Sequence, residues 1–215
     1  MSWGEMKKAV NSTVGAGNGF KPLNLLAEKQ RYDVEYSITD TLLRLIGDEN
    51  ERIEFIPYGV TQIGSQEYQQ NTREKIIIPT TVTKIGNSAF LESQAESIVV
   101  PNTVSAIEGM AFGYCSSLRG MMLPSALTEI SYQMFADCTS LECVGIPEGL
   151  KAIRYQAFVG CANLKSIRIP NTVTTIEQGV FEGCTNLTDI YVGFSEGAVL
   201  GAPWGAPNAT IHYQS

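Results

Sequence analysis

The chain has 215 residues, of which 44% are hydrophobic and 17% charged, and its formal net charge is −7. This length allows one or two domains with a sizeable apolar core. Because the negative charge is spread along the chain, a nucleic-acid partner is not expected. No run of 18 or more apolar residues occurs, so the sequence predicts no direct insertion into a membrane.

The first 52 residues are expected to form a helical N-terminal cap. The stretch SITDTLLRLIGDENE places Leu42, Leu45 and Ile46 on one face of a predicted helix. A second short helix is predicted in WGEMKKAVNSTVG. Such a cap is expected wherever a stacked fold would otherwise leave the core of its first coil exposed.

Residues 53–192 repeat themselves with a period of 22 or 23 residues. Each unit has a proline, an isoleucine six residues later and an aromatic residue eleven residues later. The six prolines are Pro57, Pro79, Pro101, Pro124, Pro147 and Pro170. Self-similarity at this period is typical of a solenoid, in which each unit forms one coil.

Each unit closes with a short alternating stretch before the next proline, as in KIIIP, SIVVP and SIRIP. Alternation of β-branched residues predicts a strand. A unit with one strand can pair only with the equivalent strand of its neighbours, which predicts a parallel sheet. The intervening segments, such as IGNSAF, are too short for a long helix and predict a single helical or 3-10 turn. The predicted fold is therefore an α/β solenoid of about six coils.

The unit P-x-x-V-x-x-I-x-x-x-A-F-x-x-C-x-x-L-x-x-I-x-I, read in PNTVSAIEGMAFGYCSSLRGMML, closely resembles the BspA-like leucine-rich repeat. The resemblance implies a right-handed repeat fold and a role in surface attachment or protein–protein contact, as is typical of bacterial surface proteins. The first two units depart from the pattern, with Tyr68 in place of Phe and with Asn71 and Ser93 in place of Cys.

Four cysteines occupy the same position in successive units. Side chains stacked in register lie about 4.8 Å apart and point the same way, which disfavours disulfides. Four sulfurs spread over about 14 Å cannot bind one zinc ion. The sequence therefore predicts free thiols that are buried as small hydrophobic groups. They are Cys115, Cys138, Cys161 and Cys184.

The remaining polar and reactive residues do not indicate catalysis. Cys143 is expected to point out of the sheet, either as a tolerated surface residue or as a reactive thiol. His212, which is the only histidine, lies in the strand-like TIHY, where a structural role is favoured. No phosphate-binding loop and no acid–base pair is apparent. We therefore expect neither an enzyme nor a cofactor or metal site.

The outward residues of the predicted strands are the candidate ligand-binding surface. Ile77, Val99 and Met122 would form an exposed apolar stripe, which often marks a contact site. The alternative is that the N-terminal segment covers this stripe. Arg168, Tyr191 and Asp189 would form a polar recognition patch at the other end of the same face. The expected partner is a protein or glycan, from a host or a bacterial surface.

Residues 193–215 break the repeat and are expected to form a C-terminal cap. The stretch GFSEGAVLGAPWGAPNATIHY predicts a loop anchored by Trp204 and followed by a final strand. This cap would cover Phe181 and Ile190 of the last coil.

A second resemblance concerns about twenty residues at the start of the chain. The opening WGEMKKAVNSTVG…FKPL is similar to proteins encoded among the prophage tail genes of gut Firmicutes. It implies a phage-virion component as the alternative to a cell-surface or extracellular adhesin. The opening residues show no secretory leader, which leaves the export route open.

Overall fold

The computed structural model describes residues 53–214. The chain divides into two compact units, residues 1–51 and residues 52–215. The predicted helical cap and the opening that resembles prophage tail proteins therefore lie outside the described residues.

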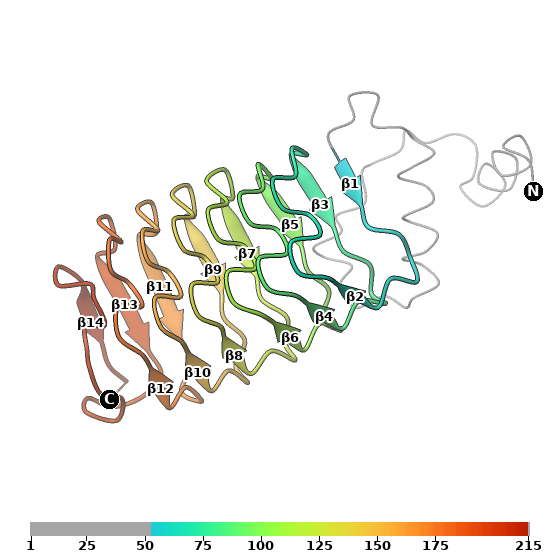
Figure 1. The fold of residues 1–215 in the computed structure, drawn as a ribbon. Helices are drawn as coiled ribbons and strands as arrows, with labels where there is room; N and C mark the ends of the chain where they lie inside the picture. The colour runs from blue at the N-terminus through green and yellow to red at the C-terminus, as the bar shows by residue number, and fades with distance from the viewer. Residues whose placement is uncertain (1–52, 215) are drawn as a thin grey trace, which may run out of the picture. The chain divides into compact units, whose positions relative to one another are not determined.

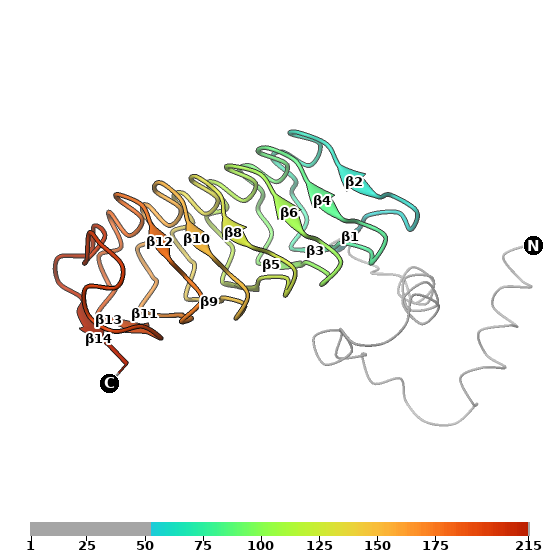
Figure 2. The same ribbon diagram turned by 90° about the horizontal axis from the view of Figure 1, so that it is seen from below.

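The described residues form a parallel β-solenoid with two rows of strands, which run along two faces of the coils (Figures 1 and 2). The first row consists of β1 (Ile53–Phe55), β3 (Lys75–Ile77), β5 (Ser97–Val99), β7 (Gly120–Met122), β9 (Cys143–Gly145), β11 (Ser166–Ile169), β13 (Asp189–Val192) and β14 (Thr210–His212). The second row consists of β2 (Gln62–Ile63), β4 (Lys84–Ile85), β6 (Ala106–Ile107), β8 (Glu129–Ile130), β10 (Ala152–Ile153) and β12 (Thr175–Ile176).

Equivalent strands of neighbouring coils pair in parallel, as the sequence predicts. Ile76 faces Ile98 between β3 and β5, and Ile167 faces Ile190 between β11 and β13. The first row comprises a sheet in the order β1-β3-β5-β7-β9 and another in the order β11-β13-β14. The second row comprises two sheets of three strands, β2-β4-β6 and β12-β10-β8.

The second row of strands corrects the prediction of one strand per coil. The structure also differs at the predicted helical or 3-10 turns, because residues 53–214 contain no helix. In their place the backbone makes paired turns in which the N–H groups alternate between local and intercoil bonds. Phe90 N donates to Ala111 O of the next coil at 2.8 Å, whereas Leu91 N donates to Ser88 O within its own coil at 3.1 Å.

The backbone conformation explains why these turns do not become helices. Two positions in each coil have a positive φ, which is incompatible with a right-handed helix. The first position is occupied by Gln66, Ser88, Met110, Gln133, Gln156 and Gly179. The second is occupied by Gln70, Glu92, Tyr114, Asp137, Gly160 and Gly183.

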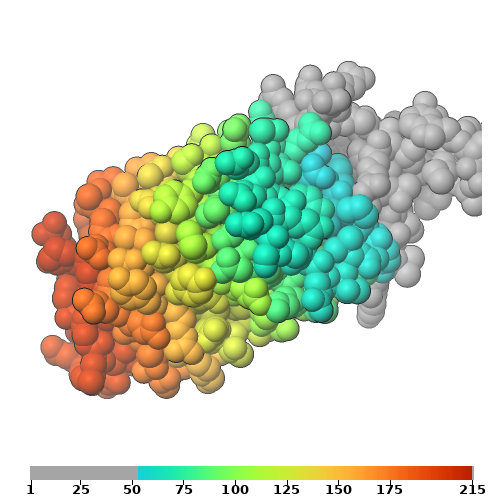
Figure 3. Space-filling view, in the orientation of Figure 1, coloured from blue at the N-terminus to red at the C-terminus, as the bar shows by residue number. Residues whose placement is uncertain are grey.

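A column of stacked aromatic rings forms the centre of the core. It starts with Tyr68 and continues through five phenylalanines that are fully buried, with ring centroids 5.3–5.8 Å apart. The phenylalanines are Phe90, Phe112, Phe135, Phe158 and Phe181. Each ring from Phe90 to Phe158 stacks on the ring of the coil before it and on the ring of the coil after it. The coils are therefore closely packed along the solenoid (Figure 3).

Trp204 closes the last coil. Its side chain is buried, its Nε1 donates to Leu200 O at 2.8 Å, and Phe194 meets it edge-on with the ring centroids 6.4 Å apart. Its own carbonyl oxygen accepts a hydrogen bond from Phe181 N at 2.9 Å. Strand β14 then pairs in parallel with β13, which places Ile211 beside Ile190.

Candidate partner-binding surfaces

The four cysteines in register are free and buried, which confirms the prediction from their spacing. Each thiol also donates a hydrogen bond to a carbonyl oxygen of the preceding coil. Cys115 bonds to Phe90 O at 3.1 Å and Cys138 to Phe112 O at 3.0 Å. Burial, followed by interaction with Cys115, raises the pKa of the Cys138 thiol well above its usual range, so this thiol is not an activated nucleophile.

Cys143 is exposed at the start of β9. Its Sγ lies over Gly120 of the neighbouring strand, where an added Cβ would come within 2.9 Å of the sulfur. The glycine therefore provides the space in which the Cys143 side chain rests.

The predicted apolar stripe on the first row is not an exposed surface. Ile77 is 3% exposed and Val99 is 9% exposed, whereas Met122 is 57% exposed. In the register of the sheets, Ile77 lies between Phe55 and Val99, so these apolar side chains stack on one another. The alternative that residues 1–52 cover the stripe lies outside the described residues. Of the three predicted contacts, only Met122 presents its side chain to solvent.

The strand beside Met122 leaves room for its side chain. Its register partner is Gly145, where an added Cβ would lie 2.3 Å from the Met122 sulfur. The methionine therefore lies across a position that has no side chain.

At the other end of the first row, the structure brings together the three predicted polar residues and adds a fourth. Arg168 faces Tyr191, and Tyr191 faces His212 in the register of β11, β13 and β14. The rings of Tyr191 and His212 stack with their centroids 4.4 Å apart and an interplanar angle of 13°. Arg168, Asp189, Tyr191 and His212 are called the terminal patch below.

Asp189 orients the histidine of the terminal patch. Its Oδ1 lies 2.7 Å from His212 Nε2, and its Oδ2 accepts a hydrogen bond from Thr188 Oγ1 at 2.8 Å. The hydrogen bond to His212, followed by the bond from Thr188, lowers the pKa of Asp189. His212 was expected to have a structural role. Its position beside Tyr191 could not be predicted from the sequence, because the repeat that sets the register ends before His212.

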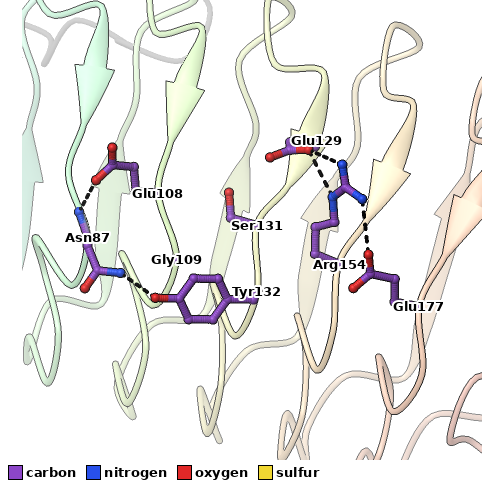
Figure 4. A pocket seen from close by; sticks show the side chains of 8 residues that line it. All are labelled: Asn87, Glu108, Gly109, Glu129, Ser131, Tyr132, Arg154 and Glu177. Atoms are coloured by element: carbon purple, nitrogen blue, oxygen red, sulfur yellow. Dashed lines mark hydrogen bonds and ion pairs between the residues drawn. The ribbon is translucent and has the colours of Figure 1, made fainter.

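A groove of about 580 Å³ lies along the second row of strands (Figure 4). It is lined by Asn87, Glu108, Gly109, Glu129, Ser131, Tyr132, Arg154 and Glu177. Most of these residues come from or directly follow the two-residue strands β6, β8, β10 and β12. This groove has no signature in the repeat pattern, which predicts one strand per coil and not the second row of strands.

Arg154 joins two carboxylates at one end of the groove. Its Nη2 donates to Glu129 Oε2 at 2.7 Å and its Nε to the same oxygen at 3.0 Å. Its Nη1 donates to Glu177 Oε1 at 3.1 Å. Figure 4 shows the guanidinium between the two glutamates. The hydrogen bonds to Glu129 and Glu177 raise the pKa of Arg154 further, so its charge is permanent.

Glu108 is held in a similar way at the other end. Lys84 Nζ lies 2.6 Å from Glu108 Oε1, and Asn87 N donates to Glu108 Oε2 at 2.9 Å. The hydrogen bond with Lys84 is the main cause that lowers the pKa of Glu108, so this carboxylate is ionised at neutral pH.

Tyr132 forms the aromatic part of the groove. Its ring lies over Gly109, where an added Cβ would come within 2.2 Å of Tyr132 Cε1. Its hydroxyl accepts a hydrogen bond from Asn87 Nδ2 at 2.8 Å, which spans two coils (Figure 4). The ring is therefore fixed in place, although Tyr132 is 47% exposed.

Two further properties concern metal ions and membranes. Within residues 53–214, no group of three or more His, Cys, Asp or Glu side chains is arranged to hold a metal ion. No helix in that same part of the chain has the length and apolarity to cross a bilayer.

Comparison with known proteins places the repeat in a family. The model of the BspA type leucine rich repeat region matches residues 61–188 with six copies, which is more than half of the chain. The protein therefore belongs to the BspA-type leucine-rich repeat family, as the resemblance of its units implies.

Two solved structures have a similar fold. A leucine rich repeat protein of T. pallidum has 29% sequence identity and a TM-score of 0.65, over 74% of this chain and 78% of that one. A leucine rich cell surface protein of Faecalibacterium prausnitzii has 28% identity and a TM-score of 0.52, over 67% of this chain and 48% of that one. This chain thus spans about half of the second protein. The search of curated proteins found no match.

Proposed function

We propose that the protein is a non-enzymatic binding and adhesion module of a bacterial surface, which contacts a protein or glycan through the terminal patch. Membership of the BspA-type leucine-rich repeat family supports a binding role. The similar protein of F. prausnitzii is described as a cell surface protein, which supports the location.

The observation that carries the proposal is the arrangement of the terminal patch. An arginine, a tyrosine and a histidine lie side by side on three neighbouring strands, and Tyr191 is 45% exposed. None of the four side chains belongs to the hydrophobic core. Tyrosine and arginine are enriched among the residues that contribute most to binding at protein interfaces.

The patch is also organised before a partner binds. Stacking against Tyr191 and the bond to Asp189 hold the His212 ring in one orientation. A side chain that is already ordered loses less conformational freedom on association, which favours affinity. Met122, which is exposed on β7 of the same row, is the apolar residue available to extend the contact.

Arrays of purified proteins and glycans, probed with the labelled full chain, test this proposal. Each hit is then measured by surface plasmon resonance with a variant that carries Arg168→Ala, Tyr191→Ala and His212→Ala. We expect its affinity to fall at least tenfold. This loss corresponds to about 1.4 kcal/mol, and truncation of a single strongly contributing tyrosine or arginine costs about 2 kcal/mol or more. The matched control is Tyr155→Ala, which removes an equally exposed tyrosine outside the patch. Affinity that is unchanged in the triple variant would exclude the terminal patch.

The proposed location is tested separately with an antibody against the chain. Washed intact cells, cleared medium and purified phage particles from one induced culture are probed side by side. Signal on intact cells supports the surface adhesin, and signal confined to the particles contradicts it in favour of a virion component.

A further inference from the structure

We infer that the groove on the second row of strands is a separate binding site, which accepts a lysine or arginine side chain of a partner protein. This site lies on a different row of strands from the terminal patch and shares no residue with it. The inference therefore does not depend on the proposed function.

The groove exists because small residues alternate with large ones on this face. Gly109 has no side chain, so the Tyr132 ring can lie flat over it, and Ser131 is small and buried with its hydroxyl bonded to Ile107 O. Between the charged ends of the groove, the small Ser131 and the flat Tyr132 ring leave a depression into which a side chain can enter. Tyr132 closes one side of that depression, and Figure 4 shows its ring extending across Gly109 toward Asn87.

The charges of the lining favour a cation. Three glutamates and one arginine line the groove, and Lys84 beside it neutralises Glu108. Arg154 already lies between Glu129 and Glu177, so an anion that approached its guanidinium would also meet two carboxylates. Charge complementarity therefore selects a positively charged group over a negatively charged one.

Glu129 provides the open acceptor for that group. Both of its bonds from Arg154 go to Oε2, and Oε1 accepts no hydrogen bond from any residue between 53 and 214. The Glu129 side chain is partly exposed. An ammonium or guanidinium can donate to Oε1, which gives a charge-assisted hydrogen bond.

Tyr132 provides the second contact. It follows Glu129 by three residues on the same coil and lines the same groove. The exposed ring can receive the cation or the aliphatic part of the incoming side chain. The bond from Asn87 holds the ring in position for this contact.

The test is a two-dimensional NMR titration of the full chain with a pair of synthetic peptides. One is acetyl-Gly-Ser-Lys-Ser-Gly-amide, and the other is identical except that its lysine is acetylated. We expect the lysine peptide to shift the amide signals of Gly109, Ser131 and Tyr132. The acetylated peptide should bind at least ten times more weakly, because it lacks the charge that Glu129 recognises.

Variants assign the interaction to individual side chains. Glu129→Gln and Tyr132→Ala should each weaken the lysine peptide at least fivefold. The matched control is Tyr155→Ala, because Tyr155 has the same place in the next coil and the same 47% exposure but does not line the groove. Circular dichroism melts establish that each variant is folded. Tyr191→Ala should leave peptide binding unchanged, which separates this site from the terminal patch.

Three results would overturn the inference. The first is equal binding of the two peptides, since the site would then not recognise charge. The second is the absence of shifts in the groove at millimolar concentrations of the lysine peptide. The third is a titration in which cellotetraose, a neutral oligosaccharide, shifts the groove signals and the lysine peptide does not, which would point to a glycan.

Discussion

At the scale of single residues, the cysteines show how one column of the repeat connects neighbouring coils. Cys161 and Cys184 continue the pattern of the first two, with Sγ 3.1 Å from Phe135 O and Phe158 O respectively. A thiol is small enough for the buried turn and still provides a weak donor for a carbonyl oxygen that would otherwise have fewer partners. The column therefore contributes both packing and hydrogen bonds.

Replacing Cys138 tests these two contributions. Cys138→Ala removes the sulfur and its bond to Phe112 O, and we expect it to lower the free energy of unfolding by about 1–3 kcal/mol. Cys138→Ser keeps a donor of similar size and should cost less than the alanine variant. Serine occupies the equivalent position 93 in an earlier coil. Urea unfolding followed by circular dichroism measures both, and a serine variant less stable than the alanine variant would contradict the role of the hydrogen bond.

The Asp189–His212 pair predicts a dependence on pH. The pKa of Asp189 is lower in the folded protein than its usual value, which it has in the unfolded chain. The pair therefore stabilises the fold at pH values above the pKa that Asp189 has in the unfolded chain. This stabilisation is lost as the pH falls through the pKa of Asp189 in the folded protein. His212→Ala should raise the pKa of Asp189 toward its usual value, while the bond from Thr188 keeps part of the shift. Carboxyl ¹³C titrations by NMR measure this pKa. An unchanged Asp189 titration in the variant would show that His212 does not cause the shift.

At the scale of the structural element, the turns between the two rows of strands are decided by two positions with positive φ. In the last two of the six repeats, three of the four such positions are glycine. In the earlier coils they carry side chains, which costs about 1 kcal/mol or more for each residue in the left-handed region. The alternating local and intercoil hydrogen bonds hold the backbone in this conformation.

Two glycine substitutions test this explanation. Gly183 has a φ of 75°, and an added Cβ would lie 3.2 Å from Gly160 N, so Gly183→Ala should destabilise the protein by about 1–2 kcal/mol. The control is Gly149→Ala, whose Cβ would meet Ser125 O at an ordinary 3.7 Å and whose φ is not positive. This variant should be neutral or stabilising by up to about 1 kcal/mol. Urea midpoints compare the two, and equal midpoints would contradict the explanation.

At the scale of the whole solenoid, stability depends on contacts between neighbours. The aromatic column and the strand ladders join each coil only to the coil before and the coil after it. Stability in such an array is approximately a sum of terms from each coil and each interface between coils. The coil at the end has one neighbour fewer, and Trp204 with β14 supplies the missing contacts.

Removal of Trp204 should therefore destabilise one end more than the middle. Trp204→Ala deletes a buried ring and its hydrogen bond to Leu200 O, which is expected to cost about 3–5 kcal/mol. Hydrogen exchange followed by mass spectrometry should show the largest loss of protection over residues 181–192, while β5 and β7 keep most of theirs. An equal loss along the whole solenoid would contradict the neighbour-based view.

Three properties could be predicted from the sequence: the period, the parallel pairing of the first row and the burial of the four cysteines. These properties follow from the repeat alone, because stacking turns each column of the sequence into a line in space. The register of the repeat likewise predicts that Arg168, Tyr191 and Asp189 point outward and lie together.

Three other features became apparent from the three-dimensional structure: the second row of strands, the turns without helices and the groove. A strand of two residues is too short to show a period of its own, and positive φ at Gln66 or Tyr114 has no signature in residue type. The burial of Ile77 and Val99 is also absent from the alternation of residues, which predicts that both side chains point outward. The placement of His212 beside Tyr191 likewise depends on how the chain returns after the repeat ends, and that path is set by contacts such as those of Trp204.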